Sequence, residues 1–527
     1  MKIDKNKINI PFCIGVVFLI CVTIIEFCYI LKLNNGLFIY TLDDPYIHMA
    51  LAEKIKLWHY GINTNEFSAP SSSILWPFIL APFSFYEYSP LLINIICAIA
   101  TVFVISKIFE LSLNTGDKRI NNLFSSIIII LFVLATNIVG LIFTGMEHSL
   151  QVLLVAVIVY GIITEAKDEK IKWWFIVAII LAPLIRYECV AISISAVVYV
   201  LIRGYYKQAI SITVLLVAFL IGFSVFLVSL GLDPFPTSVV VKSSVVETGG
   251  AIHSVITNLK RSLTNRQGFV LLFGMLALLA YAFSGKNLKK RQIALVSVGA
   301  IFMHFIAGQY DSGNRYEIYI VLFMMLVILY IFAPLINKFT VSNKKLDVNA
   351  TFVTIVITIG FTILIGAPYI NGLFALPIAS NNIYEQQYQM SRFATYYNKP
   401  VAVNDLGCVS YKNPNYVLDL WGLGSKKSLE LRISNNTLDW MKIQCSKSSV
   451  GLVMIYEDWF GQEYPDGWIK IGELHLGKQQ FTVAQTNVSF YATNRDAYPE
   501  IINKLHLFVK TLPADVNFIF EEEAGMK

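Results

Sequence analysis

Long apolar stretches recur along the first two thirds of this chain, separated by short polar segments. A helix that spans a bilayer needs about 20 mostly apolar residues. Eleven segments meet that requirement closely enough to be predicted spans: 12–31, 90–109, 122–141, 147–164, 171–186, 188–203, 209–231, 267–284, 292–308, 316–335 and 351–370. The pattern predicts an α-helical polytopic membrane protein.

The pattern changes after residue 370. Short apolar runs of strand length alternate there with stretches of helical period. The predicted helices are 383–398 and 436–445, and the predicted strands are 400–405, 416–420 and 450–459. Alternating elements of this kind indicate a small α/β domain. We therefore expect a transmembrane domain at 1–370, with a first outer loop at 32–89 and a second at 232–266, and an α/β domain at 371–527.

Composition agrees with the membrane assignment. Of the 527 residues, 56% are hydrophobic and only 14% are charged, whereas a soluble globular protein carries roughly 25% charged residues. The net charge of +6 indicates oriented basic loops rather than a nucleic-acid partner, because lysine and arginine gather in the cytoplasmic loops of membrane proteins.

The basic residues also predict an orientation. The chain begins "MKIDKNK", and the loop at 286–291 reads "KNLKKR". Both segments fall on the cytoplasmic side if the N-terminus is cytoplasmic. An odd number of spans then places 371–527 outside. We favour an uncleaved first span over a signal peptide, because the apolar run 12–31 is long and no small-x-small cleavage site follows it.

Polar clusters interrupt the chain on the side predicted to be outside, whereas the inner loops are short and basic. In the predicted topology all five clusters share one membrane face, which predicts a site at the outer lipid–water boundary. They are "LDDPYIH" (42–48), "TGMEHS" (144–149), "RYE" (186–188), "DPFPTSVVVKSS" (233–244) and "YDSGNRYE" (310–317).

The two adjacent acids Asp43 and Asp44 follow the first span. Asp44 before Pro45 is typical of a helix N-cap followed by a first-turn proline. Apolar residues continue at helical spacing to Trp58, so 45–58 is predicted to be an amphipathic helix on the membrane surface. Capping accounts for Asp44 and leaves Asp43 as the stronger catalytic candidate.

The other clusters each have a structural interpretation that stays open. Glu147 and His148 could simply begin a span. Arg186 and Glu188 could form an ion pair at a turn. Basic side chains near span ends also reach lipid headgroups, and this interpretation applies to Lys242 and Arg315.

In the predicted outer domain, "VNDLG" places Asp405 at the end of a strand. Ligands often bind at strand ends in α/β sheets, although a plain turn would explain the same residues. Cys408 and Cys445 could pair in an oxidising compartment, but spacing alone does not show that their geometry allows a disulfide.

The ordered motifs resemble those of type C (GT-C) membrane glycosyltransferases, in particular the branch that includes polyprenyl-phosphate-dependent arabinofuranosyltransferases. "DDPYIHMALAE" followed by "NTNEFSAPSSSILWPFILAPF" resembles the first outer loop of that branch. Further motifs follow in the same order and on the same predicted side, and the likeness extends to residue 425. They are "TGMEHSLQ", "RYE", "FPTSVVVKS", "GNRYEIY" and "VAVNDLGCVSYKNPNYVLDLWGLGS".

Two departures from the motifs of this family leave the identity of the sugar donor open. Many members have Ser-Pro where this chain has "SSSIL", and many have Arg-Pro-Glu where Arg186 is followed by Tyr187.

The resemblance implies an enzyme of a bacterial plasma membrane that uses a polyprenyl-phosphate-linked sugar and a glycan, lipid or protein acceptor. Asp43 is then the general base that takes the proton of the acceptor hydroxyl. Asp44 orients the acceptor or, with Asp43, helps to hold Mg²⁺, Mn²⁺ or Ca²⁺, for which carboxylates are suitable ligands. Cations meet the charge of the leaving phosphate, and one displacement inverts the anomeric carbon. The candidate phosphate-binding residues are Lys242, Arg186 and Arg315.

The remaining polar residues of the clusters are candidate substrate contacts: His48, Glu147, His148, Glu188, Tyr316 and Asp405. Two other classes of function stay open. A transporter or flippase of lipid-linked sugars places its charges near the bilayer midplane, often in two related halves, and no such repeat is evident. A non-catalytic glycan-binding membrane protein would leave Asp43 dispensable.

Overall fold

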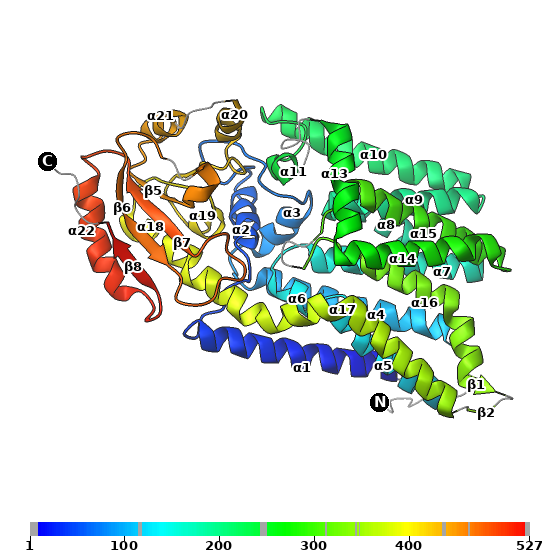
Figure 1. Cartoon of the computed structure of the whole chain (residues 1–527). Coiled ribbons are helices and arrows are strands. Elements are labelled where there is room, and N and C mark those ends of the chain that lie inside the picture. Colours follow the sequence, from blue (N-terminus) through cyan, green and yellow to red (C-terminus); the bar gives the residue numbers. More distant parts are fainter. Residues whose placement is uncertain are drawn as a thin grey trace, which may run out of the picture. The chain divides into compact units, whose positions relative to one another are not determined.

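The structure, a computed structural model, describes residues 9–113, 118–242, 250–310, 314–342, 345–346, 348–434, 439–461 and 464–521. Within these residues, nine helices are long and apolar enough to cross a membrane (Figure 1). The predicted fold class is confirmed, and the chain is a multi-pass membrane protein.

The long helices coincide with nine of the predicted spans. They are α1 (Ile10–Leu33), α4 (Ser89–Ser112), α5 (Lys118–Ala135), α7 (His148–Asp168), α10 (Tyr206–Ser229), α14 (Arg266–Ser284), α15 (Leu288–Ala307), α16 (Ile318–Thr340) and α17 (Val348–Glu385). The spans predicted at 171–186 and 188–203 are the shorter apolar helices α8 (Trp173–Ile185) and α9 (Val190–Ile202). Helix α17 continues to Glu385, so the domain boundary expected at residue 370 lies inside a helix.

The chain divides into two compact units. The helical unit comprises residues 1–25, 91–221 and 244–374. The α/β unit comprises residues 26–90, 222–243 and 375–527. The first outer loop therefore belongs to the same unit as the C-terminal sheet.

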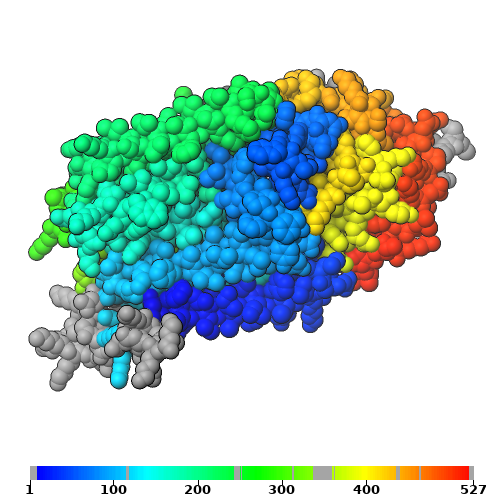
Figure 2. Space-filling model, turned by 180° about the vertical axis from the view of Figure 1, so that it is seen from behind, coloured from blue at the N-terminus to red at the C-terminus, as the bar shows by residue number. Residues whose placement is uncertain are grey.

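Membrane helices pack against one another within the helical unit. Helix α15 contacts α9 and α14, and α7 contacts α8 and α16. Residues 10–25 of helix α1, dark blue in Figure 2, lie at the surface of this unit. The side chains of Val17, Ile24 and Ile25 are exposed, as expected of a helix whose outer side faces lipid.

The α/β unit contains a six-stranded sheet in the order β4-β3-β5-β7-β6-β8. Strands β4, β3 and β5 are parallel, and the remaining neighbours are antiparallel. The strands are β3 (Val401–Val403), β4 (Val417–Asp419), β5 (Leu452–Ile455), β6 (Ile469–His475), β7 (Asn487–Ala492) and β8 (Asn517–Phe520). The α/β domain predicted from the alternating pattern is confirmed.

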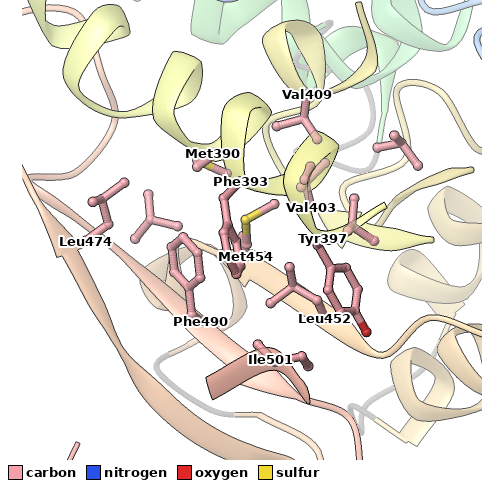
Figure 3. Close-up of a cluster of buried hydrophobic side chains, with 14 of the residues drawn as sticks. Met390, Phe393, Tyr397, Val403, Val409, Leu452, Met454, Leu474, Phe490 and Ile501 are labelled. Atoms are coloured by element: carbon pink, nitrogen blue, oxygen red, sulfur yellow. The ribbon is translucent and has the colours of Figure 1, made fainter. Parts of the chain in front are cut away.

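Helix α18 (Gln387–Tyr397) covers one face of this sheet. Figure 3 shows Met390, Phe393 and Tyr397 of α18 near Leu452 and Met454 of β5, and all five side chains are in one buried cluster. The intervening residues of β5 belong to a second cluster with residues of α21 (Asp439–Lys447). This alternation follows from the pleat of a strand, which points successive side chains to opposite faces.

The first outer loop forms helices α2 (Asp44–Ile55) and α3 (Trp76–Leu80). Helix α2 packs against α3 and against α19 (Gly407–Ser410) of the same unit. Its residues are buried without interruption from Pro45 to Ala52, and Trp58, beyond the helix end, is 98% exposed. The prediction of a surface helix with an apolar stripe to Trp58 is therefore wrong, because tertiary packing covers both faces of α2. The outer loop predicted at 232–266 also contains helices, α11 (Thr237–Lys242) and α13 (Ala251–Thr264).

Candidate active site

Asp43 lies at the N-cap of α2, and its carboxylate turns away from that helix. The Gly407 N–H donates to Asp43 Oδ2 at 2.5 Å, and the Cys408 N–H donates to Oδ1 at 2.7 Å. The N-cap side chain makes no capping hydrogen bond. The expectation that Asp44 caps the helix is wrong, since α2 already includes Asp44; Asp43 is in the cap position and binds a distant loop instead.

Gly407 approaches Asp43 so closely that a side chain would not fit. A Cβ atom on Gly407 would lie 2.2 Å from the Asp43 carbonyl oxygen and 2.5 Å from Oδ2. Contacts under 3.0 Å force a neighbour to move, and one of these atoms is backbone. The glycine therefore lets two backbone N–H groups reach the carboxylate. The "DLG" motif marked Asp405 as a candidate, but it gave no indication of this partner.

Asp405 forms a carboxyl pair with Asp43. The two side chains are hydrogen-bonded to each other. Burial raises the pKa of Asp43, and burial together with the neighbouring Asp43 raises the pKa of Asp405 well above its usual range. Two like charges at this separation cannot both ionise easily. Because two backbone N–H groups stabilise the charge on Asp43, Asp405 is the member that keeps the proton and donates to Asp43.

A buried amide and a phenol hold Asp405 in place. Gln387 Nε2 of α18 donates to Asp405 Oδ2 at 2.9 Å and lies 2.7 Å from Tyr456 Oη. The Tyr456 hydroxyl in turn donates to the side chain of Gln386. This network fixes the carboxyl pair from the side of the sheet. None of the three supporting residues stood out in the sequence.

His48, a predicted substrate contact, is buried in α2. Its Nδ1 lies 3.1 Å from the hydroxyl of Ser71, and that hydroxyl donates to the Ser73 carbonyl at 2.6 Å. The contact links α2 to the serine-rich segment before α3. Cys408 and Cys445 are both buried and both free, so the disulfide considered from the sequence is not formed.

A second group of predicted residues comes together in the helical unit around Arg186. Its Nη1 lies 2.9 Å from Glu147 Oε1, and its Nη2 lies 2.5 Å from Glu188 Oε1. Its Nε also donates to the second Glu188 oxygen at 3.1 Å, so the contact with Glu188 is bidentate. Arg186 is 5% exposed and Glu147 is fully buried. Buried charges are costly unless they are paired, and here two carboxylates flank one guanidinium.

The ring of Tyr316 joins further members of this group. The guanidinium carbons of Arg186 and Arg315 lie 5.4 and 5.1 Å from the ring centroid, and the ring of His148 lies 6.1 Å away. Arg315 and His148 are both buried. Lys242 is the last residue of α11, and its side chain lies outside the described part of the structure.

The Asp43 carboxylate is poorly placed to hold, with Asp44, the divalent ion that the resemblance implies. Among the described residues, no three His, Cys, Asp or Glu side chains gather as metal ligands. Each Asp43 oxygen already faces a backbone N–H, and the protonated Asp405 is a further donor. A cation would have to displace these donors, so a metal at this carboxylate is disfavoured.

Comparisons with known proteins agree with the fold. Residues 381–491 match a family described as a domain of unknown function (DUF8728). No curated protein matches the chain. The solved structure of ArnT from Cupriavidus metallidurans bound to undecaprenyl phosphate is similar over 92% of this chain and 98% of that chain, with 10% identity and a TM-score of 0.51.

A second solved structure, the oligosaccharyltransferase of Archaeoglobus fulgidus in its apo form, is 11% identical over 93% of this chain and 78% of that one, with a TM-score of 0.43. The similarity to ArnT shows that the chain has the fold of GT-C membrane glycosyltransferases, as its motifs predict.

Proposed function

From the GT-C fold and the Asp43–Asp405 pair, we propose that the chain transfers a sugar from a polyprenyl-phosphate donor to a glycan, lipid or protein acceptor. The reaction takes place on the outer face of a bacterial plasma membrane. The observation that carries the proposal is the buried carboxyl pair, in which two backbone N–H groups hold Asp43. A carboxylate that is held in place and has a raised pKa is suited to act as a general base.

Asp43 accepts the proton of the acceptor hydroxyl in this proposal. A carboxylate has about four lone-pair sites. Two of them accept the backbone N–H groups, and the acceptor hydroxyl takes the place of one of the two side-chain donors, Asp405 and Cys408. The acceptor oxygen bonds to the anomeric carbon while the bond from that carbon to the phosphate oxygen breaks. The leaving phosphate keeps the electron pair of that bond. One such displacement inverts the anomeric configuration.

The donor is proposed to be a polyprenyl-phosphate sugar, which the ArnT complex with undecaprenyl phosphate supports. Arg186 already faces the carboxylates of Glu147 and Glu188. Arg186, Arg315 and Lys242 each stay candidates for binding the donor phosphate. Glu147, Glu188, His148 and Tyr316 remain candidate substrate contacts.

The experiment is a transfer assay with the purified full-length protein in lipid nanodiscs. A panel of polyprenyl-phosphate sugars, pentoses and hexoses among them, is offered with an envelope extract as acceptor, and release of polyprenyl phosphate is measured. We expect release with at least one donor and none with the Asp43→Asn protein. If no donor of the panel is consumed, or if both proteins consume it equally, the proposal fails.

A further inference from the structure

The α/β unit contains a pocket of about 840 Å³ that none of the assignments above uses. The pocket is lined by chain segments from the first outer loop, from α18, from the segment after β3 and from the end of α22 (Tyr498–Phe508). Its lining is rich in tyrosine: Tyr40, Tyr46, Tyr88, Tyr388, Tyr396 and Tyr411. Pockets for small ligands typically have this size and combine aromatic walls with a few polar groups.

Helix α18 has two faces with different roles. One face packs into the core of the sheet, as Met390, Phe393 and Tyr397 show in Figure 3. Tyr388 and Tyr396, two helical turns apart, are on the face that lines the pocket. Residues 391, 392 and 395 between them contribute a serine, an arginine and a threonine to the same wall. The face that lines the pocket therefore combines aromatic rings with hydrogen-bonding groups.

A second part of the lining, from the first outer loop, is aromatic and already ordered. The ring of Phe38 stacks on Tyr88 with centroids 5.5 Å apart and meets the edge of Tyr40 at 5.0 Å. The Tyr40 hydroxyl donates to the Glu87 carbonyl at 2.8 Å. Aromatic groups held in this way bind a ligand without first losing conformational freedom.

Charged and polar groups frame these rings. Arg392 Nη1 donates to Gln389 Oε1 at 2.6 Å, and its Nη2 donates to Thr511 Oγ1 at 3.2 Å. Lys412 pairs with Glu87 at 3.3 Å. A purely apolar chain, such as an isoprenoid tail, would displace water from these charged groups without offering them hydrogen bonds, which is costly. A sugar offers C–H faces to the rings and hydroxyls to the polar groups, so carbohydrate has the chemistry that this lining matches.

One wall of the pocket contacts the proposed base. Cys408 lines the pocket, and both its backbone N–H and its thiol are hydrogen-bonded to Asp43. Tyr46, three residues after Asp43, also lines the pocket. We propose that this pocket binds carbohydrate and is the subsite for a glycan acceptor; the second part rests on the proposed function.

Binding is tested without any donor, so that the result does not depend on catalysis. Labelled full-length protein in nanodiscs is applied to an array of oligosaccharides of two to six units built from glucose, galactose, mannose, arabinose and N-acetylglucosamine. We expect binding to a subset, weakened about tenfold by Tyr396→Ala, since tenfold is about 1.4 kcal/mol and lies within the range of a stacked aromatic contact. Tyr396→Phe keeps the ring and should bind like the wild type.

Tyr464→Ala is the matched control, since Tyr464 is 43% exposed and lies outside the pocket lining, whereas Tyr396 is 47% exposed. The proposal is overturned if no oligosaccharide binds, or if Tyr396→Ala and Tyr464→Ala bind alike. It is also overturned if Tyr396→Ala loses co-purified lipid while glycan binding is unchanged, which would make the pocket a lipid site.

The transfer assay separates this proposal from the function on which it partly rests. As an acceptor subsite, the pocket predicts that Tyr396→Ala raises the acceptor KM about tenfold and leaves kcat nearly unchanged. If the wild type binds glycan but transfers no sugar, the proposed function is contradicted and glycan binding by the pocket is not. Transfer with an unchanged acceptor KM in Tyr396→Ala would contradict the acceptor subsite alone.

Discussion

Asp43 and Gly407 are 364 positions apart in the chain, yet the Gly407 N–H donates to the Asp43 carboxylate at 2.5 Å. The bond fixes the first outer loop to the segment after β3 within one compact unit. It also sets the ionisation of the Asp43–Asp405 pair, because a carboxylate that accepts N–H bonds keeps its charge more easily.

Gly407→Ala should disable the site. A Cβ atom there would lie 2.2 Å from the Asp43 carbonyl oxygen and 2.5 Å from Oδ2, so the carboxylate has to move. We expect turnover to fall by about 10²-fold, a cost known for a misplacement of about 1 Å. Gly222→Ala is the control, because Gly222 is in α10 and has open space around its Cβ position. Equal turnover in the two variants would show that the close approach has no catalytic importance.

Asp43→Asn and Asp44→Asn should differ in turnover. The amide of the Asp43→Asn protein keeps the size of the side chain but cannot take a proton, so we expect a loss of about 10²–10⁴-fold. Asp44 is within the first turn of α2, and its change should cost a small part of the rate. Donor binding should survive in both proteins, since neither acid is assigned to the phosphate. Turnover and donor affinity are measured in one membrane preparation, and wild-type turnover by Asp43→Asn would remove Asp43 as the base.

Asp405 should control the pH profile through its hydrogen bond to Asp43, which lowers the pKa of Asp43. Asp405→Ala removes the donor, so the pKa of Asp43 rises and the acid limb of the kcat/KM profile moves to higher pH. Asp405→Asn retains an N–H donor and should restore the limb toward its wild-type position. A limb that stays in place in Asp405→Ala would mean that Asp405 does not act on the base.

The Asp43–Asp405 pair also predicts the direction in which stability changes with pH. The pKa of folded Asp405 is raised above its usual value of 3.8, so the folded protein holds a proton that the unfolded chain releases. The associated stability is fully present below the unfolded pKa and is lost as pH rises through the folded pKa. Asp405→Asn has no such titration. Its melting temperature should therefore fall less than that of the wild type as pH is raised above 4.

Arg186→Ala should destabilise the helical unit. The change removes the ion pairs of Arg186 with Glu147, which is fully buried, and with Glu188. Removing one partner of a buried pair costs about 3–5 kcal/mol. Lys107→Ala is the control, since Lys107 forms an exposed pair with Glu110 that should contribute at most about 1 kcal/mol. Thermal unfolding in detergent is the measurement, and similar melting of both variants would contradict the structural role of Arg186.

Cysteine accessibility should establish the orientation of the chain. Cysteines introduced at Gly285 and at Lys510 are treated with a membrane-impermeant thiol reagent in intact cells, in a background without native cysteines. The basic loop at 286–291 predicts that position 285 is protected until the membrane is opened. Position 510 should react in intact cells. A protected position 510 would place the α/β unit in the cytoplasm and remove the outer-face assignment of the site.

The sequence alone determined the classes of element in both parts of the chain. Apolar runs of span length and the α/β alternation after residue 370 are local patterns, because helices and strands each have a characteristic side-chain period. Asp43 and Asp405 were also found from local signals, an unexplained acid beside a cap and an acid at a strand end.

Only the tertiary structure decided which faces of these elements are buried, where α17 ends and which groups contact Asp43. Packing against α3 and α19 buries both faces of α2, which a stripe of apolar residues along one helix does not indicate. Helix α17 carries the chain past the change in composition to Glu385. The partners of Asp43 are backbone N–H groups that every residue except proline carries, so no side-chain pattern marks them; the folded path of the chain selects Gly407 and Cys408.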